Sequence, residues 1–142
     1  MNQAAFESFS INMVEAITRA LESQNVPVDI NTVMERARNI ELFVIEYLTL
    51  LAQRHNAMGY QDCVSEIETA LNNQSSQYPT SYTTRFVDRQ ALALWHYCKN
   101  ESILDSAGSR LFTILEYDPD YREVLISSLA PIIQKLFGEN NE

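Results

Sequence analysis

Six segments of the chain place apolar residues three or four positions apart, which is the spacing of one face of an α-helix. In the first segment the charged residues Glu7, Arg19 and Glu22 fall off this line, so an amphipathic helix is predicted. Pro27 ends that helix, because proline cannot donate a helical hydrogen bond. The apolar residues of this segment are Phe6, Phe9, Met13, Ile17, Ala20 and Leu21.

The pattern of residues 32–55 predicts one continuous helix at the centre of the fold. Thr32 and Glu35 have the spacing of a capping box, which marks a helix start. Apolar residues then cover almost the whole circumference, and a helix that is apolar nearly all round is usually buried. Gly59 is the predicted stop, because glycine adopts the left-handed conformation that closes helices.

The second half of the chain predicts three further helices. A weaker capping box begins at Ser102 and ends at Asp105. Asp118 is the predicted N-cap of the last helix, with Pro119 at the first helical position, where its missing amide is not needed. Pro131 lies inside this last helix and predicts a bend.

These segments together predict an all-α protein, a compact bundle of about six helices around residues 32–55. The length fits a single helical domain over residues 1–142. We expect two three-helix halves, residues 1–71 and 84–138, joined by a polar loop at residues 72–83.

Residues 109–123, with the sequence SRLFTILEYDPDYRE, resemble the helix, Asp-Pro turn and second helix of HEAT-like arrays. The likeness extends over about 50 residues. It implies HEAT-like helix pairs in the second half of the chain.

Charge and hydropathy narrow the classes of partner. The formal net charge of −9 repels nucleic-acid phosphates and anionic membranes, so neither is an expected partner. The longest strongly apolar stretch, Leu42 to Ala52, is interrupted by Glu46 and is shorter than the roughly 20 residues of a membrane span. Cys63 and Cys98 are too few for a disulfide framework, and the N-terminus has no secretory-signal pattern. We expect a cytoplasmic protein, of a cell or of a host.

Candidate chemistry centres on His55. Residues 53–59, QRHNAMG, resemble the His-x-x-Lys-Gly segment of histidine phosphotransfer domains, with Met58 in place of the lysine. This resemblance implies an alternative function as a phosphotransfer protein or other small helical enzyme acting through His55. His55, His96, Cys63 and Cys98 are of the residue types that ligate zinc. However, the sequence lacks the Cys-x-x-Cys and Cys-x-x-His pairs that structural zinc sites use. We therefore predict no metal and no cofactor.

The remaining catalytic patterns are also missing from the sequence. It contains no glycine-rich phosphate loop, nucleophile elbow or His-Glu-x-x-His segment. We therefore predict a non-enzymatic module, an adaptor, inhibitor or regulatory subunit, that binds another protein. Residues 101–142 carry eight acidic and three basic residues, a net of −5, so the partner is expected to be basic.

Tryptophan, tyrosine and arginine side chains are the commonest binding hot spots, and aromatic residues cluster in the second half of the chain, with Arg110 and Arg122 beside them. The predicted contact is an acidic and aromatic surface or a groove between helices. A mimic of nucleic acid or an immunity-type protein that neutralises a basic partner is a more specific alternative. A homodimer through exposed Ile133 and Phe137 is a further expectation. The predicted partner-binding residues are Tyr97, Arg110, Glu116, Tyr117, Asp118, Asp120, Tyr121 and Arg122.

Overall fold

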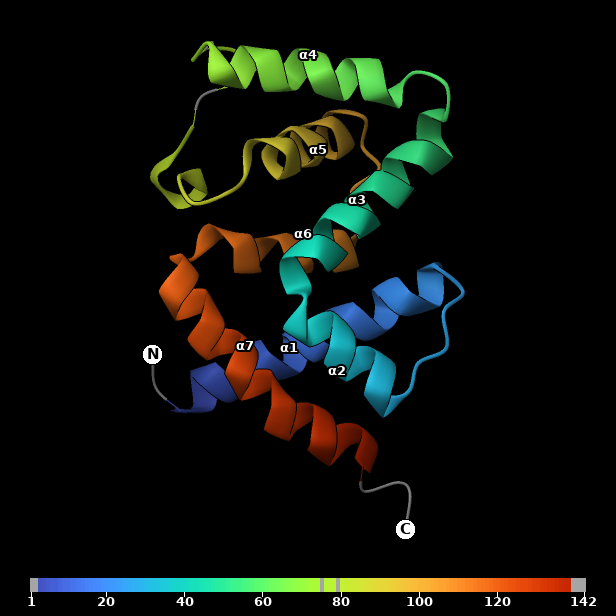
Figure 1. Ribbon diagram of the computed structural model, residues 1–142, viewed down its shortest axis with the longest axis vertical. Coiled ribbons are helices and arrows are strands. Elements are labelled where there is room, and N and C mark those ends of the chain that lie inside the picture. Colours follow the sequence, from blue (N-terminus) through green and yellow to red (C-terminus); the bar gives the residue numbers. More distant parts are fainter. Residues whose placement is uncertain (1–2, 75, 79, 139–142) are drawn as a thin grey trace.

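The computed structural model of the chain describes residues 3–74, 76–78 and 80–138. Within these residues every regular element is a helix and no strand is present, so the predicted all-α class is confirmed (Figure 1). The α-helices are α1 (Gln3–Ser23), α2 (Ile30–Arg38), α3 (Ile40–Asn56), α4 (Tyr60–Asn72), α5 (Arg89–Asn100), α6 (Ser106–Phe112) and α7 (Pro119–Ile133). The shorter elements are the 3₁₀ turns η1 (Tyr82–Thr84) and η2 (Thr113–Glu116) and the π-helical segment η3 (Gln134–Gly138).

Helices from both halves of the sequence share one apolar core. The helix α5 packs on α3 and α4, whereas α6 and α7 both pack on α1, and α2 packs on α7. Figure 1 shows α3 crossing obliquely between the layer of α4 and α5 and the layer of α1, α2 and α7. Each large side chain buried in this way stabilises the fold by roughly 1.5–3 kcal/mol. The largest side chains that are almost fully buried include Tyr47, Phe43, Phe112, Met13, Ile17 and Leu21.

The predicted continuous helix over residues 32–55 is wrong, because the chain leaves helical geometry at Asn39. This residue has φ −117° and ψ 43°, and it separates α2 from α3. The Asn39 backbone N–H and its side-chain amide both donate to the Glu35 carbonyl, the amide at 3.0 Å. Asparagine competes in this way with the helical backbone, so one polar residue ends α2 and turns α3 toward α5.

Two predicted helix starts are displaced by a few residues. The N-cap of α2 is Asp29 rather than Thr32, and its carboxylate accepts from the Thr32 amide at 2.8 Å. The cap of α6 is Asp105 rather than Ser102, because the Asp105 carboxylate reaches the Gly108 amide. The predicted cap Asp118 is confirmed, with its carboxylate 2.9 Å from the Asp120 amide.

The structure also bears on the predictions made for Gly59, for Pro131 and for a homodimer contact through Ile133 and Phe137. Gly59 does not close a helix in the left-handed conformation; its φ is −124°, and it is the N-cap of α4. Pro131 lies inside α7, which ends at Ile133 and is followed directly by the π-helical segment η3 from Gln134. Ile133 is fully buried and Phe137 is half-buried, so Ile133 offers no exposed homodimer contact.

The end of the predicted loop at residues 72–83 overlaps the turn η1, and the loop residues Ser75 and Pro79 lie outside the described part. In the HEAT-like segment, the first helix corresponds to α6 followed by η2, and Asp118 and Pro119 form the N-terminus of the second helix, α7. However, α6 and α7 pack chiefly on α1 rather than on each other.

Candidate functional site

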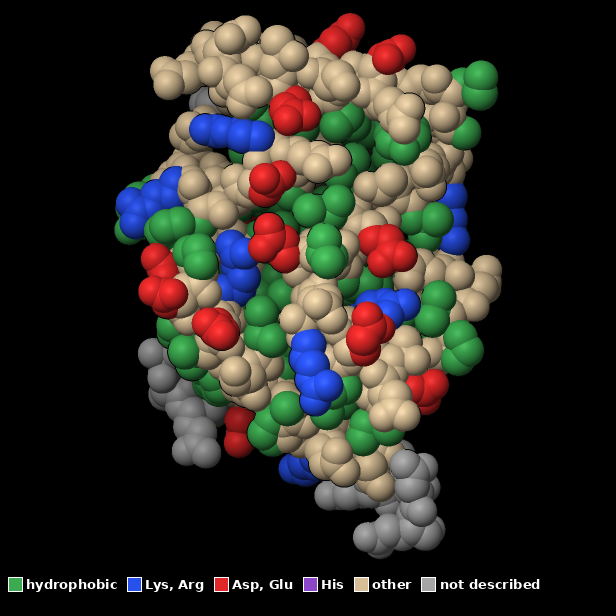
Figure 2. All heavy atoms as spheres, viewed as in Figure 1, with side chains coloured by type: hydrophobic (Ala, Val, Ile, Leu, Met, Phe, Trp, Pro, Cys, Tyr) green, Lys and Arg blue, Asp and Glu red, His purple; other side chains and the backbone are tan. Residues whose placement is uncertain are grey.

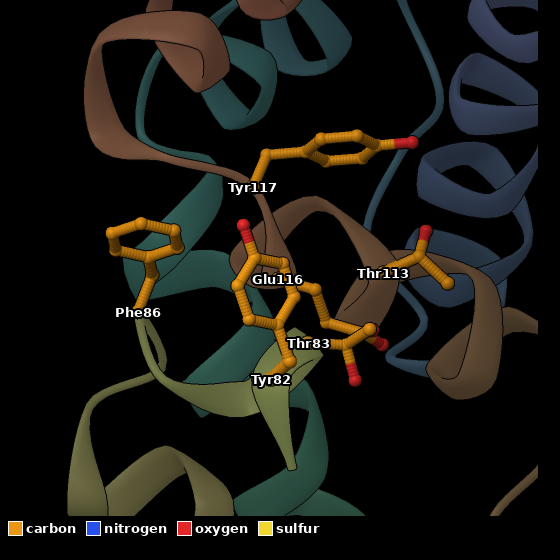
Figure 3. Close-up of a pocket in the computed structure, with 6 residues that line it drawn as sticks. All are labelled: Tyr82, Thr83, Phe86, Thr113, Glu116 and Tyr117. Carbon is orange, nitrogen blue, oxygen red and sulfur yellow. The ribbon is translucent and has the colours of Figure 1, made fainter.

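A pocket of about 320 Å³ opens between the two 3₁₀ turns η1 and η2 (Figure 3). Its walls combine three aromatic rings, two threonine side chains and one carboxylate. The turns are far apart in sequence, so the pocket exists only in the folded chain. The lining residues are Tyr82, Thr83, Phe86, Thr113, Glu116 and Tyr117.

The turn η1 is shaped by hydrogen bonds between Ser81 and Thr84. The Ser81 amide donates to the Thr84 hydroxyl at 3.0 Å, and the Thr84 hydroxyl donates to the Ser81 carbonyl at 3.1 Å. This reciprocal capping holds the intervening residues in a tight turn. As a result, the Tyr82 ring projects outward and is 76% exposed.

The turn η2 is held from the other side by the buried Arg122. The guanidinium donates to the carbonyls of Leu115 and Tyr117, at 3.0 and 3.3 Å, and to the Glu41 carboxylate at 3.1 Å. These carbonyls flank Glu116, so Arg122 fixes the backbone that carries the pocket's carboxylate. Charge-assisted hydrogen bonds of this kind are about twice as strong as neutral ones.

The rings of the pocket are supported by further aromatic contacts. The Tyr117 ring meets the ring of Phe9 on α1 edge to face, with centroids 6.0 Å apart, and lies 5.6 Å from the ring of Tyr121. Such pairs contribute roughly 0.5–1.5 kcal/mol beyond the buried area. The Tyr117 wall is therefore well anchored.

Glu116 is the charged group of the pocket, and it is half-buried. Figure 3 shows its side chain beside Thr83 and among the aromatic rings. None of the ion pairs that the described residues form involves Glu116. Burial raises the pKa of Glu116, while the Thr83 side chain opposes this shift. The pocket thus holds a carboxylate without a counter-ion in weakly polar surroundings, which favours binding of a cation.

Five of the eight predicted partner-binding residues lie at or next to this pocket. Glu116 and Tyr117 line it. Tyr121 packs on Tyr117 and is 39% exposed. Asp118 and Asp120 follow at the start of α7, and both are exposed.

The other three predicted partner-binding residues lie away from the pocket or are buried in the protein interior. Tyr97 is only 3% exposed, because α5 is covered by both α3 and α4. Arg122 is 8% exposed and supports η2 from within. Arg110 is half-buried on α6, with its guanidinium 3.8 Å from the Glu15 carboxylate. Tyr97 and Arg122 therefore present no open surface to a partner.

Sequence reasoning missed four of the six residues that line the pocket. Tyr82 and Thr83 fall in the segment predicted to be a polar loop, Phe86 follows that segment, and Thr113 lies in the HEAT-like segment but was not predicted to bind a partner. The one local signal is the Ser81 and Thr84 spacing, which permits a capped turn. Nothing local indicates that this turn faces η2.

A second pocket, of about 410 Å³, lies between α3, α4 and α5. Its lining is mostly polar, and none of the predicted partner-binding residues contributes to it. The lining residues are Thr49, Tyr60, Gln61, Val64, Ser65, Glu68, Gln90 and Leu94.

The surroundings of His55 bear on the phosphotransfer alternative. The His55 Nε2 atom lies 3.1 Å from the Glu101 carboxylate, and the ring meets the Tyr97 ring edge to face. Met58, which replaces the family's lysine, is 96% exposed. The neighbouring carboxylate repels an incoming phosphoryl group, so this arrangement gives the alternative no support.

Within the described residues, no group of three or more His, Cys, Asp or Glu side chains is placed to hold a metal ion. None of the helices in the same part of the chain has the length and apolar character needed to cross a membrane. Comparison with models of protein families found no match, and comparisons with curated proteins and with solved structures found no significant similarity.

Proposed function

We propose that the chain is a non-enzymatic protein-binding module, and that a basic segment of a partner protein docks at the pocket around Glu116. The observation that carries this proposal is the half-buried Glu116 carboxylate, which has no ionic partner among the described residues. A desolvated carboxylate of this kind gains a counter-ion only when a ligand supplies one.

The exposed aromatic rings support the same proposal. Tyr82 and Tyr121 are large, rigid side chains at the pocket and beside it, and both are exposed. Tyrosine supplies contact area at a small cost in conformational entropy and is enriched at binding hot spots. A partner that covers these rings would bury apolar surface next to Glu116.

The distribution of charge favours a basic partner. Asp118 and Asp120 lie just after the pocket, and the whole chain has a net charge of −9. This charge attracts cationic segments over a Debye length, about 8–10 Å at physiological salt. On the face shown in Figure 2, however, Lys and Arg side chains are interspersed with Asp and Glu. A local acidic pocket therefore has more support than a continuous acidic surface that imitates nucleic acid.

The proposal can be tested by affinity capture from cells that produce the chain, with three baits compared. These baits are the unaltered chain, Glu116→Gln and Glu66→Gln. Glu66 is an exposed residue of α4, outside the pocket, so its substitution removes the same charge without changing the site. We expect a protein that the unaltered chain and Glu66→Gln retain and that Glu116→Gln loses.

The bound segment of that protein is then identified by limited proteolysis of the complex. We expect a segment with a net positive charge, and a complex that weakens as salt is raised. Equal retention by all three baits, or a protected segment without Lys or Arg, would contradict the proposal.

A further inference from the structure

Arg85 already places a cation on two rings of the pocket. Its guanidinium carbon lies 4.4 Å from the centroid of the Tyr82 ring and 4.5 Å from that of the Phe86 ring. Both distances are within the roughly 6 Å over which aromatic faces attract cations. The spacing of these two rings therefore suits a guanidinium group.

Arg85 and Glu116 nevertheless do not neutralise each other. Neither residue takes part in any ion pair formed by the described residues. Among the described residues, a cation thus lies over the Tyr82 and Phe86 rings, while the pocket that these rings line holds a carboxylate without an ion pair. The guanidinium of a ligand could contact both the aromatic rings and the carboxylate, because it stacks on aromatic faces and also pairs with a carboxylate through parallel hydrogen bonds.

We propose that the pocket binds the guanidinium of a partner's arginine between its aromatic rings and the Glu116 carboxylate, and that Arg85 is the resident competitor for the Tyr82 and Phe86 faces. This inference rests on the proposed function and names its ligand group. The volume of about 320 Å³ is at the small end of the range for ligand pockets, roughly 300–1,000 Å³, and fits one inserted side chain. A ligand guanidinium on the ring faces that Arg85 covers would displace Arg85 from them.

The competition has a measurable size. An exposed contact between a cation and an aromatic ring changes an equilibrium constant by roughly two- to fivefold. Arg85 makes two such contacts, so its removal should tighten binding of a guanidinium ligand by about 4- to 25-fold.

The test is an NMR titration with capped tripeptides, read from the methyl signals of Thr83 and Thr113 in the pocket wall. The probe is acetyl-Gly-Arg-Gly-amide. Its matched control contains citrulline, which keeps the shape of arginine without the charge. A third peptide contains trimethyl-lysine and separates a guanidinium site from a quaternary ammonium site.

Four forms of the chain are compared: unaltered, Arg85→Met, Arg89→Met and Glu116→Gln. Arg89 is exposed and contributes nothing to the pocket lining, so Arg89→Met removes the same charge without freeing the rings. The substituted residues are exposed or half-buried, and circular dichroism verifies that each variant keeps its helices.

We expect millimolar binding of the arginine peptide, at least tenfold weaker binding of the citrulline peptide, and loss of binding in Glu116→Gln. Arg85→Met should tighten binding by about 4- to 25-fold, and Arg89→Met by less than about twofold. Equal effects of Arg85→Met and Arg89→Met, or tighter binding of the trimethyl-lysine peptide than of the arginine peptide, would overturn this inference. Either result would leave the proposal of a protein-binding module intact. If about 10 mM of any cationic peptide gives no shift that depends on Glu116, both this inference and the proposed function fall.

Discussion

Replacing Arg122 with methionine tests how the pocket is held in place. The substitution removes the donor for the carbonyls of Leu115 and Tyr117 and the ion pair with Glu41. A buried carbonyl left without a donor costs about 1–3 kcal/mol. Part of this cost is offset. In the unaltered chain the buried Arg122 Nε atom has no hydrogen-bond partner, so the substitution also removes the cost of burying that atom. We therefore expect Arg122→Met to lower the free energy of unfolding by about 2 kcal/mol.

The matched control is Glu41→Gln, which removes only the ion pair. The Glu41 side chain is 51% exposed, and such pairs contribute about 0–1 kcal/mol. Urea unfolding followed by far-UV circular dichroism measures both variants, and the dependence of the unfolding free energy on urea should stay unchanged. Two results would refute the reasoning: a loss below about 0.5 kcal/mol in Arg122→Met, or an equal loss in Glu41→Gln.

Three further predictions concern individual side chains. Tyr47→Phe removes the hydrogen bond to the Asp105 carboxylate and should cost about 1–3 kcal/mol in urea unfolding. Burial and this bond raise the pKa of Tyr47 from 10.0 to about 12. The protonated Tyr47 side chain therefore contributes fully to stability below pH 10, and this contribution is lost as the pH rises toward 12. Tyr47→Phe should abolish this dependence of stability on pH. The buried Cys98, with a pKa raised to about 12 by desolvation, should resist iodoacetamide in the native chain while half-buried Cys63 reacts, and mass spectrometry should find both alkylated in urea. Because burial raises the pKa of Glu116, Glu116→Gln should increase stability at pH 7, and thermal unfolding should show this gain vanish as the pH falls toward the ordinary pKa of 4.5.

The helices could be predicted because their signals are local. The apolar spacing that predicts α1 places Met13 and Ile17 in the core, where both are at most 2% exposed. Asp118 and Pro119 likewise determine the start of α7 by short-range geometry. These features need no knowledge of the rest of the chain.

The break at Asn39 could not be predicted in the same way. Apolar residues continue with helical spacing on both sides of it, from Ala37 to Ile40 and Val44. A single asparagine inside such a pattern is compatible with a continuous helix, and it is the packing of α2 on α7 and of α3 on α5 that makes the break favourable.

The candidate site shows the same division between local and long-range information. Glu116 and Tyr117 were predicted from local charge and aromatic content, and they line the pocket. Tyr82 and Phe86 come from a turn about 30 residues earlier, so only tertiary packing reveals them. Tyr97 was predicted to lie on a binding surface but is buried. Helical periodicity predicts one buried face, whereas α5 is covered on two sides, by α3 and α4.

The most direct test of the binding proposal is a double-mutant cycle between Glu116 and the arginine of a captured partner segment. Affinities of a synthetic peptide and its citrulline version are measured by calorimetry against the unaltered chain and Glu116→Gln. The account predicts a coupling energy of at least about 1.5 kcal/mol, as for close charge pairs across interfaces. Additive effects within about 0.5 kcal/mol would show that Glu116 does not contact the ligand cation, and would contradict the account.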